Sequence, residues 1–276
     1  MTTISIVMAC LRSDRSNAGP LAVAADIARR FSAAVVGVVA RQASMHSAVV
    51  AVGPGGPPER DLEQFRERAA AAEAEFRSAL SKVEDIRWRS QMTAGPPSRH
   101  VAADARGVDL IVAAVEPGER VFPSSGEIDV SDLLMRAGRP VFIAPAGAAG
   151  LKLERALVCW KESREARRAV ADALPLLKAC KEVDVLELVD EREIERARSR
   201  LADIGDWFAR HGVEANCLAL QLQGTEAAHL AAIARERDVD LIVGGAFGRS
   251  RMRQWAFGGV TRDLLLKADR CALISH

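Results

Sequence analysis

The chain lacks the charge excess that would direct it to a charged partner. Its 276 residues include 38 Lys and Arg and 37 Asp and Glu, a formal net charge of +1. This balance argues against a nucleic-acid binder driven by bulk electrostatics. No apolar run approaches the roughly 20 residues of a membrane span. Residues 1–6 enter a strand pattern without the basic and apolar regions of a signal peptide. We therefore expect a cytoplasmic protein that binds neither nucleic acid nor membrane.

The sequence also lacks the short motifs of common catalytic and metal sites. It contains no G-x-S-x-G nucleophile elbow, no G-x-x-x-x-G-K-[ST] phosphate-binding loop and no H-E-x-x-H zinc-binding helix. No two of its five histidines are spaced as metal ligands are. No two cysteines form a C-x-x-C pair, so we expect reduced thiols that act as small core residues. The cysteines are Cys10, Cys159, Cys180, Cys217 and Cys271. These observations predict a protein that is not an enzyme and has no metal site of its own.

What the chain does contain is an internal repeat. The run Val-Asp-Leu-Ile-Val at 108–112 recurs 131 positions later at 239–243, and Asp-Leu-Leu at 132–134 recurs at 263–265 with the same offset. An offset held over this distance indicates two domains of common ancestry. We place them at 1–146 and 151–276, joined by a linker of small residues around 145–150.

Each half alternates short apolar runs with amphipathic segments. Segments 163–179 and 191–211 of the second half indicate helices, although Pro175 is expected to bend or end the first. Gly212 is a candidate C-terminal cap of the second helix, and 62–80 has a helical apolar face in the first half. Strand-like runs of the second half are 156–160, 183–189, 214–221, 239–244 and 270–275. Alternation of this kind predicts an α/β fold with two tandem, doubly wound parallel sheets.

The most informative pattern is a glycine-rich segment between a strand-like run at 239–243 and a helix-like run at 262–267. Glycines let the backbone approach an anion closely, and a helix start offers free N–H groups and a positive dipole end. A phosphate-bearing small molecule is therefore the first candidate ligand. The residues of the pattern are Gly245, Gly248, Arg249, Ser250, Gly258, Gly259, Val260 and Thr261.

This spacing resembles that of the universal stress protein family, whose nucleotide-binding branch has Gly, two residues, Gly, nine residues, Gly, and then Ser or Thr. Residues 156–166 also resemble the family's first strand and loop. With the repeat, the likeness extends over nearly the whole chain and indicates a tandem member. The resemblance implies a five-stranded parallel sheet between helices in each domain, and ATP held with its phosphates in the glycine loop. It also implies that two such domains pair along their last strands, which a tandem chain can do internally; homodimerisation is left open.

The resemblance assigns roles residue by residue. The glycines would supply N–H groups and room for phosphates, Ser250 and Thr261 would supply hydroxyls, and residues 158–161, with Trp160 and Lys161, would form a wall near base and ribose. Two positions depart from the family's pattern. Gly259 stands where Ser or Thr is usual, and Lys161 stands where an Asp is usual. Lys161 would reach a phosphate or lie in solvent.

The first half does not keep the motif. The residues 131 positions before the glycines are Ala114, Pro117, Glu127 and Ile128. Glu127, and Glu116 beside Pro117, would place carboxylates where phosphates should be, and Pro117 has no N–H to donate. We therefore predict that the first domain binds no ATP in this manner, and that it has a structural role or binds something else.

Three hypotheses follow. The first is a stress-response protein with an adenine-nucleotide site, for ATP and with magnesium only as the nucleotide's companion, in the C-terminal domain. The second is an interaction or scaffold module of the same fold that binds no nucleotide, which the changes at Gly259 and Lys161 favour. The third, a weak ATPase, ranks last because no base or metal ligand is identified.

Overall fold

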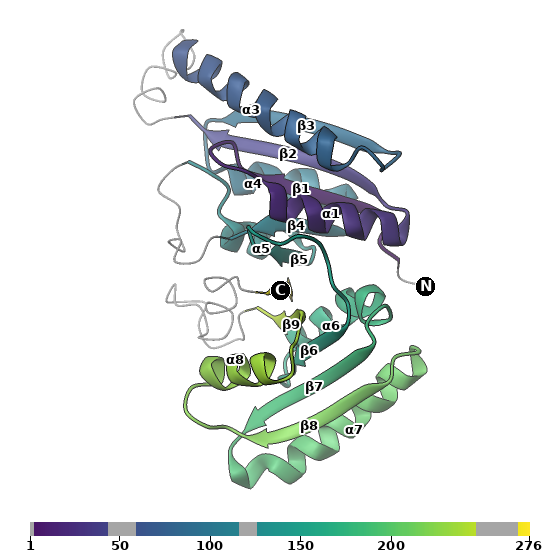
Figure 1. Cartoon of the computed structure of the whole chain (residues 1–276). Helices are drawn as coiled ribbons and strands as arrows, with labels where there is room; N and C mark the ends of the chain where they lie inside the picture. The colour runs from purple at the N-terminus through teal and green to yellow at the C-terminus, as the bar shows by residue number, and fades with distance from the viewer. Residues whose placement is uncertain (1–2, 44–58, 116–125, 247–269) are drawn as a thin grey trace. The chain divides into compact units, whose positions relative to one another are not determined.

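The computed structural model describes residues 3–43, 59–115, 126–246 and 270–276. They form two compact α/β units, one spanning Thr3–Leu151 and the other containing Lys152–His276 (Figure 1). The division therefore falls directly after the small-residue segment 145–150.

The N-terminal unit is built on five parallel strands in the order β3-β2-β1-β4-β5. The three central strands β2, β1 and β4 are apolar along most of their length, as expected for a parallel sheet covered on both faces. The strands are β1 (Ile6–Leu11), β2 (Ala34–Gln42), β3 (Ile86–Thr93), β4 (Leu110–Ala114) and β5 (Val141–Ala144).

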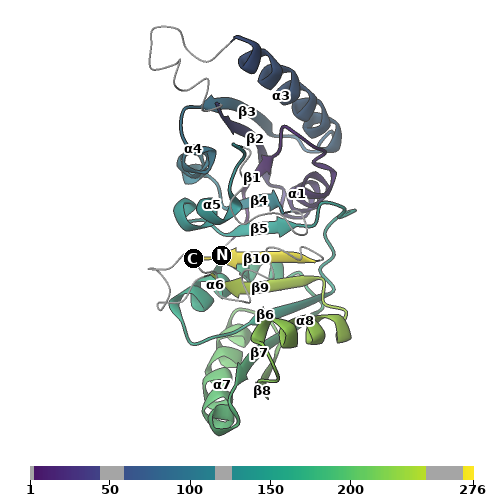
Figure 2. The ribbon, with the colours of Figure 1, turned by 90° about the vertical axis from the view of Figure 1, so that its left-hand side faces the viewer.

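Helices cover both faces of this sheet. Figure 2 shows α1 and α3 on one face and α4 and α5 on the other. The apolar face predicted at 62–80 is buried as expected, with Phe65 and Phe76 among its buried residues. The helices are α1 (Ala18–Phe31), α3 (Glu59–Ala79), α4 (Pro97–Asp104), followed by a 3-10 turn at Ala105–Gly107, and α5 (Val130–Ala137).

The C-terminal unit repeats this plan with parallel strands in the order β10-β9-β6-β7-β8. In Figure 2, α6 and α7 lie on one face and α8 on the other. Its elements are β6 (Arg155–Cys159), α6 (Arg164–Leu177), β7 (Glu182–Val189), a 3-10 turn at Glu191–Glu193, α7 (Ile194–Arg210), β8 (Ala215–Gln221), α8 (Glu226–Glu236), β9 (Leu241–Gly245) and β10 (Cys271–Ser275). The predicted fold, two doubly wound five-stranded parallel sheets, is confirmed.

The repeat is visible in the strand register. Strands β4 and β9 begin and end 131 residues apart. In the first unit Cys10 pairs with Ala113, and in the second Cys159 pairs with Gly244, at equivalent places in the two sheets. The carboxyl ends of the central strands therefore form corresponding edges in both units.

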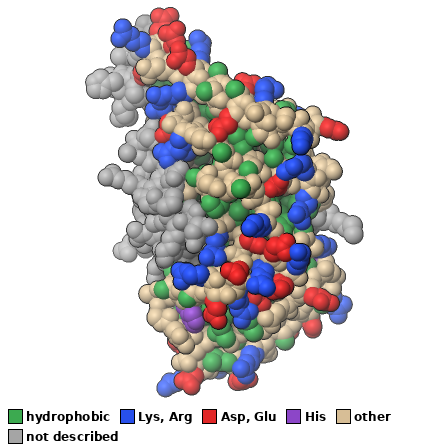
Figure 3. Space-filling view, in the orientation of Figure 1, with side chains coloured by type: hydrophobic (Ala, Val, Ile, Leu, Met, Phe, Trp, Pro, Cys, Tyr) green, Lys and Arg blue, Asp and Glu red, His purple; other side chains and the backbone are tan. Residues whose placement is uncertain are grey.

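The surface carries mixed charge. Basic and acidic side chains are interspersed on the face seen in Figure 3. Many form local ion pairs, such as Arg77 with Glu73 and Arg196 with Glu193. Within the described part of the chain, no helix combines the length and the apolarity that a membrane crossing requires.

Candidate functional site

The edge formed by the carboxyl ends of β6 and β9 is the candidate site of the C-terminal unit. These strands are neighbours, yet the chain continues from β6 to β7 on one side and from β9 to β10 on the other. They therefore flank the point where the direction of winding changes. In open α/β sheets ligands bind outside the carboxyl ends of the strands at this switch point.

Trp160 is the first residue after β6 and is buried, with 4% of its surface exposed. Its backbone N–H donates to the Leu186 carbonyl at 2.8 Å. Its indole Nε1 is also buried but has no acceptor among the described residues. An unpaired buried donor is unfavourable, and the described residues leave this N–H unsatisfied.

Lys161 follows Trp160 and is exposed. Its ammonium lies 3.3 Å from the Glu226 carboxylate, at the first residue of α8. Because 72% of the lysine side chain is in solvent, this ion pair holds it only weakly. Of the two predicted positions for Lys161, against a phosphate or in solvent, the structure shows it in solvent and paired with Glu226.

The turn after β9 begins against the start of α6. A Cβ added to Gly245 would lie 2.5 Å from the backbone carbon of Glu165 and 2.6 Å from the nitrogen of Ala166. No side chain fits there unless the backbone moves. By contrast, a Cβ at Gly244 would meet only the Cys159 Cβ, at 3.9 Å. Gly245 therefore has a packing role of its own, because it lets the end of β9 touch the first turn of α6.

The first turn of α6 is well capped. Ser163 accepts a hydrogen bond from the Ala166 N–H at 3.1 Å. Glu165 is buried, and Arg164 donates to its carboxylate at 2.5 Å. Burial opposes ionisation of Glu165, but hydrogen bonds from Arg164 and the backbone outweigh it and lower the pKa of this carboxyl. Glu165 therefore carries a charged carboxylate that is paired with Arg164, and its backbone lies beside Gly245.

Ser275, at the end of β10, completes the described part of this edge. It pairs in register with Gly245, and its carbonyl accepts from the Ala246 N–H at 2.7 Å. The side chain is fully buried, and its Oγ has no partner among the described residues. Trp160 and Ser275 thus each bring an unpaired polar atom to the same edge.

Sequence reasoning identified some of these residues and missed others. It named Trp160, Lys161 and Gly245, which the structure brings to one edge, but not Ser275, Glu165 or Glu226. A serine that ends an apolar strand was the available signal for Ser275. The remaining predicted site residues lie outside the described residues. They are Gly248, Arg249, Ser250, Gly258, Gly259, Val260 and Thr261.

The Cys159 thiol beside this edge has a raised pKa. Burial, with a smaller effect from the charge of Glu226, raises the pKa of Cys159 to about 12. Burial alone does the same for Cys10, its equivalent in the first unit. Both therefore stay protonated at neutral pH, as small packing residues do. Across the described ranges, His, Cys, Asp and Glu side chains form no cluster that could hold a metal ion.

The matching edge of the N-terminal unit holds a carboxylate. Glu127 is 3% exposed, and its Oε1 accepts from Ser13 Oγ at 3.1 Å. The Arg41 guanidinium lies 3.4 Å from the same oxygen. Ala114 ends β4 at this edge, while Glu116 and Pro117 lie outside the described residues. That this unit binds no ATP stays a prediction.

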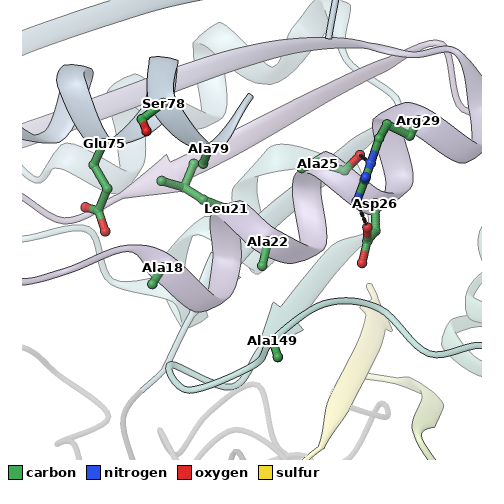
Figure 4. A pocket seen from close by; sticks show the side chains of 10 residues that line it. All are labelled: Ala18, Leu21, Ala22, Ala25, Asp26, Arg29, Glu75, Ser78, Ala79 and Ala149. Atoms are coloured by element: carbon green, nitrogen blue, oxygen red, sulfur yellow. Dashed lines mark hydrogen bonds and ion pairs between the residues drawn. The ribbon is translucent and has the colours of Figure 1, made fainter. Parts of the chain in front are cut away.

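A shallow groove lies between α1 and α3 of the N-terminal unit (Figure 4). Alanines line much of it, with Glu75 near one end and Asp26 with Arg29 near the other. Glu75 accepts bonds from Ser16 and Asn17 at the start of α1, and Asp26 accepts from Arg29 and from the Leu151 N–H at 2.7 Å. Its charged groups are thus already used in holding the unit together.

Known proteins resemble this chain in sequence and in fold. Residues 152–274 match the universal stress protein family. A universal stress protein from Archaeoglobus fulgidus has a similar structure over 97% of each chain, with a TM-score of 0.74 and 14% identity. A protein of unknown function from Pseudomonas aeruginosa matches with a TM-score of 0.59 and 15% identity, covering 99% of this chain and 92% of its own. These two likenesses show the fold.

A shorter relative has been solved with a nucleotide. This universal stress protein from Archaeoglobus fulgidus, in complex with dAMP, covers 52% of this chain and 99% of its own, with a TM-score of 0.36 and 19% identity. No curated protein matches the sequence. By sequence, residues 152–274 match the universal stress protein family, and over its full length the chain has the fold of a universal stress protein.

Proposed function

We propose that the C-terminal unit binds an adenine nucleotide, with ATP as the first candidate, at the carboxyl ends of β6 and β9. One observation carries the proposal. The glycine-bearing segment leaves β9 at the topological switch point, beside Trp160 and Lys161 at the end of β6. This edge is where an open α/β sheet offers a ligand both room and backbone N–H groups.

The proposed roles follow from chemistry and position. Gly248, Gly258 and Gly259 would let the backbone approach the phosphates, and Ser250 and Thr261 would donate hydroxyls. These assignments rest on the spacing in the sequence. Gly245 would act indirectly, because its contact with α6 fixes where the segment begins.

Two described side chains support a polar ligand at this edge. Trp160 Nε1 and Ser275 Oγ are buried and lack partners within the described residues. A ligand with polar groups at this edge would give them partners and so recover the free energy that an unpaired buried group costs. The exposed ammonium of Lys161 can turn from Glu226 toward a phosphate, since an exposed ion pair contributes at most about 1 kcal/mol.

That a family relative binds dAMP is consistent with this ligand class. The TM-score of 0.36 is too low for that ligand site to be carried over, so the proposal stands on the edge and on the glycine spacing. We propose binding without turnover, in a cytoplasmic stress-response role. The carboxylates described at this edge are paired, Glu226 with Lys161 and Glu165 with Arg164. Pairing of the two units along their last strands stays a prediction.

Isothermal titration of the full chain with ATP and magnesium tests the proposal. We expect binding tighter than about 1 mM, which corresponds to roughly −4 kcal/mol. The informative variant is Gly258→Glu, which places the carboxylate of the first repeat at the matching position of the second. It should abolish binding while the circular dichroism spectrum is unchanged. Absence of heat and of a thermal shift with millimolar ATP in the wild type would reject the site.

The contribution of Lys161, in the proposed wall of residues 158–161, is tested separately. Lys161→Ala should weaken ATP binding about fivefold, the loss of roughly 1 kcal/mol expected for one exposed contact to phosphate. Lys152→Ala removes another exposed lysine of the same unit and should leave affinity unchanged. If the two variants behave alike, Lys161 has no part in binding.

A further inference from the structure

The buried carboxylate of Glu127 lies at the place in the N-terminal unit where the fold offers a ligand site. Strands β1 and β4 flank the switch point of this sheet, as β6 and β9 do in the second. Ser13 follows the end of β1, and Arg41 lies near the end of β2. Glu127 sits just before α5, whose first N–H groups are capped by Asp129.

The chain holds Glu127 in place through its own backbone. Gly126 adopts a left-handed conformation with a φ of 71°, and its carbonyl accepts from the Gln42 N–H at 2.7 Å. A Cβ at Gly126 would already press on the Gln42 carbonyl at 3.1 Å. The bond fastens this segment to the end of β2, so Glu127 reaches its site from a fixed point.

The groups around the carboxylate are those that bind an oxyanion. Ser13 donates a hydroxyl hydrogen bond to Oε1 at 3.1 Å, and the Arg41 guanidinium lies 3.4 Å from the same oxygen. Hydroxyl and guanidinium donors are also the usual partners of phosphate and sulfate. The second oxygen, Oε2, is buried and has no partner among the described residues. The site therefore satisfies the carboxylate only in part.

We propose that Glu127 is a built-in anion that occupies an oxyanion site of the N-terminal unit, formed by Ser13 and Arg41, and thereby excludes external phosphate or sulfate from it. The position in the repeat agrees with this assignment, since Glu127 lies 131 residues before Gly258. One half thus carries an acidic side chain where the other has a glycine. A purely structural ion pair would use the same contacts but would leave no anion site when the glutamate is removed.

Nearby charges set what the emptied site would attract. Arg12 and Arg15 form ion pairs with Asp14, the carboxylate that acts on Glu127 most directly. Among the described residues, Arg41 forms its ion pair with Glu127, so removing Glu127 leaves the guanidinium charge next to the Ser13 hydroxyl. A small oxyanion matches this charge and this donor set.

The test compares two substitutions at one position in the full chain. Glu127→Ala empties the site, whereas Glu127→Gln keeps a side chain of the same length whose carbonyl can still accept from Ser13. Inorganic phosphate is titrated calorimetrically against sodium chloride of equal ionic strength. We expect Glu127→Ala to bind phosphate at least about tenfold more tightly than the wild type or Glu127→Gln. Adding Arg41→Ala to Glu127→Ala should abolish that gain.

The outcomes are decisive. Equal phosphate affinity in folded Glu127→Ala and the wild type overturns the proposal, as does a gain that persists in the double variant. If Glu127→Ala does not fold in chloride, refolding is compared in chloride and in phosphate. Recovery in phosphate by the single variant but not by the double variant supports the oxyanion site, and equal behaviour of the two overturns it. Because the site belongs to the N-terminal unit, neither result depends on ATP binding by the other unit.

Discussion

Two adjacent glycines at the end of β9 make a matched pair for a stability test. Gly244→Ala and Gly245→Ala each add one methyl group to the same strand. At Gly245 the new Cβ would lie 2.5 Å from the Glu165 backbone carbon, and at Gly244 it would lie 3.9 Å from its nearest neighbour. The first distance forces β9 and α6 apart, whereas the second is an ordinary contact.

The two substitutions are expected to change stability in opposite directions. Overpacking of this kind costs about 1–3 kcal/mol, and more where backbone rather than a side chain must move. Gly→Ala at an unstrained position stabilises by about 0.4–1 kcal/mol, because the unfolded chain loses freedom. Gly245→Ala should therefore destabilise the C-terminal unit by about 2 kcal/mol, and Gly244→Ala should leave it equal or slightly more stable.

Differential scanning calorimetry of the full chain measures both variants. For a unit of this size, about 1 kcal/mol shifts the transition by roughly 3 °C, so the Gly245→Ala transition should fall by roughly 6 °C. The N-terminal unit serves as an internal reference if the two unfold in separate transitions. Equal midpoints for the two variants would refute the close approach of β9 to α6.

Three further predictions concern charged groups. Lys161→Ala should change the free energy of unfolding by less than about 0.5 kcal/mol in urea titration, because its ion pair is exposed; a larger loss would show that the lysine supports the fold. Arg200→Ala should lower the free energy of unfolding by about 2–3 kcal/mol, since it leaves the buried Glu187 carboxylate without its 2.8 Å partner. The control Arg198→Ala removes an exposed ion pair and should leave that free energy nearly unchanged. Burial, and to a smaller extent the charge of Asp14, raise the pKa of Glu127 in the folded state above its value in the unfolded chain. The unfolded chain therefore loses this proton first, and the free energy of unfolding falls as pH rises from the unfolded pKa to the folded pKa. Glu127→Gln should therefore unfold at a higher temperature than wild type at pH 7, with the gap closing toward about pH 4; a gap independent of pH would contradict the raised pKa.

The elements of the second half could be predicted because their signals are local. Short apolar runs gave strands β6 to β10 to within one or two residues. Pro175 was expected to bend or end its helix, yet α6 continues to Leu177. Pro175 lies in the last turn, where its missing N–H removes one bond near an end that frays in any case. Gly212 is expected to cap α7, but the cap is His211, and Gly212 follows it with a left-handed φ of 76°.

The site was only partly predictable because it depends on contacts between distant segments. The first-strand loop and the glycine segment indicated that Trp160 and Gly245 meet. The burial of Trp160 and the unpaired hydroxyl of Ser275 follow from the order of the strands, which local patterns do not specify. The repeat offset placed Glu127 at a phosphate position, but its bonds to Ser13 and Arg41 depend on where β1 and β2 end.

We propose one adenine-nucleotide site per chain, in the C-terminal unit. Native mass spectrometry of the full chain with ATP and magnesium measures the stoichiometry directly. We expect one ATP per chain for the wild type, and none for Gly258→Glu. A wild-type chain that carries no nucleotide, or two, would contradict this proposal.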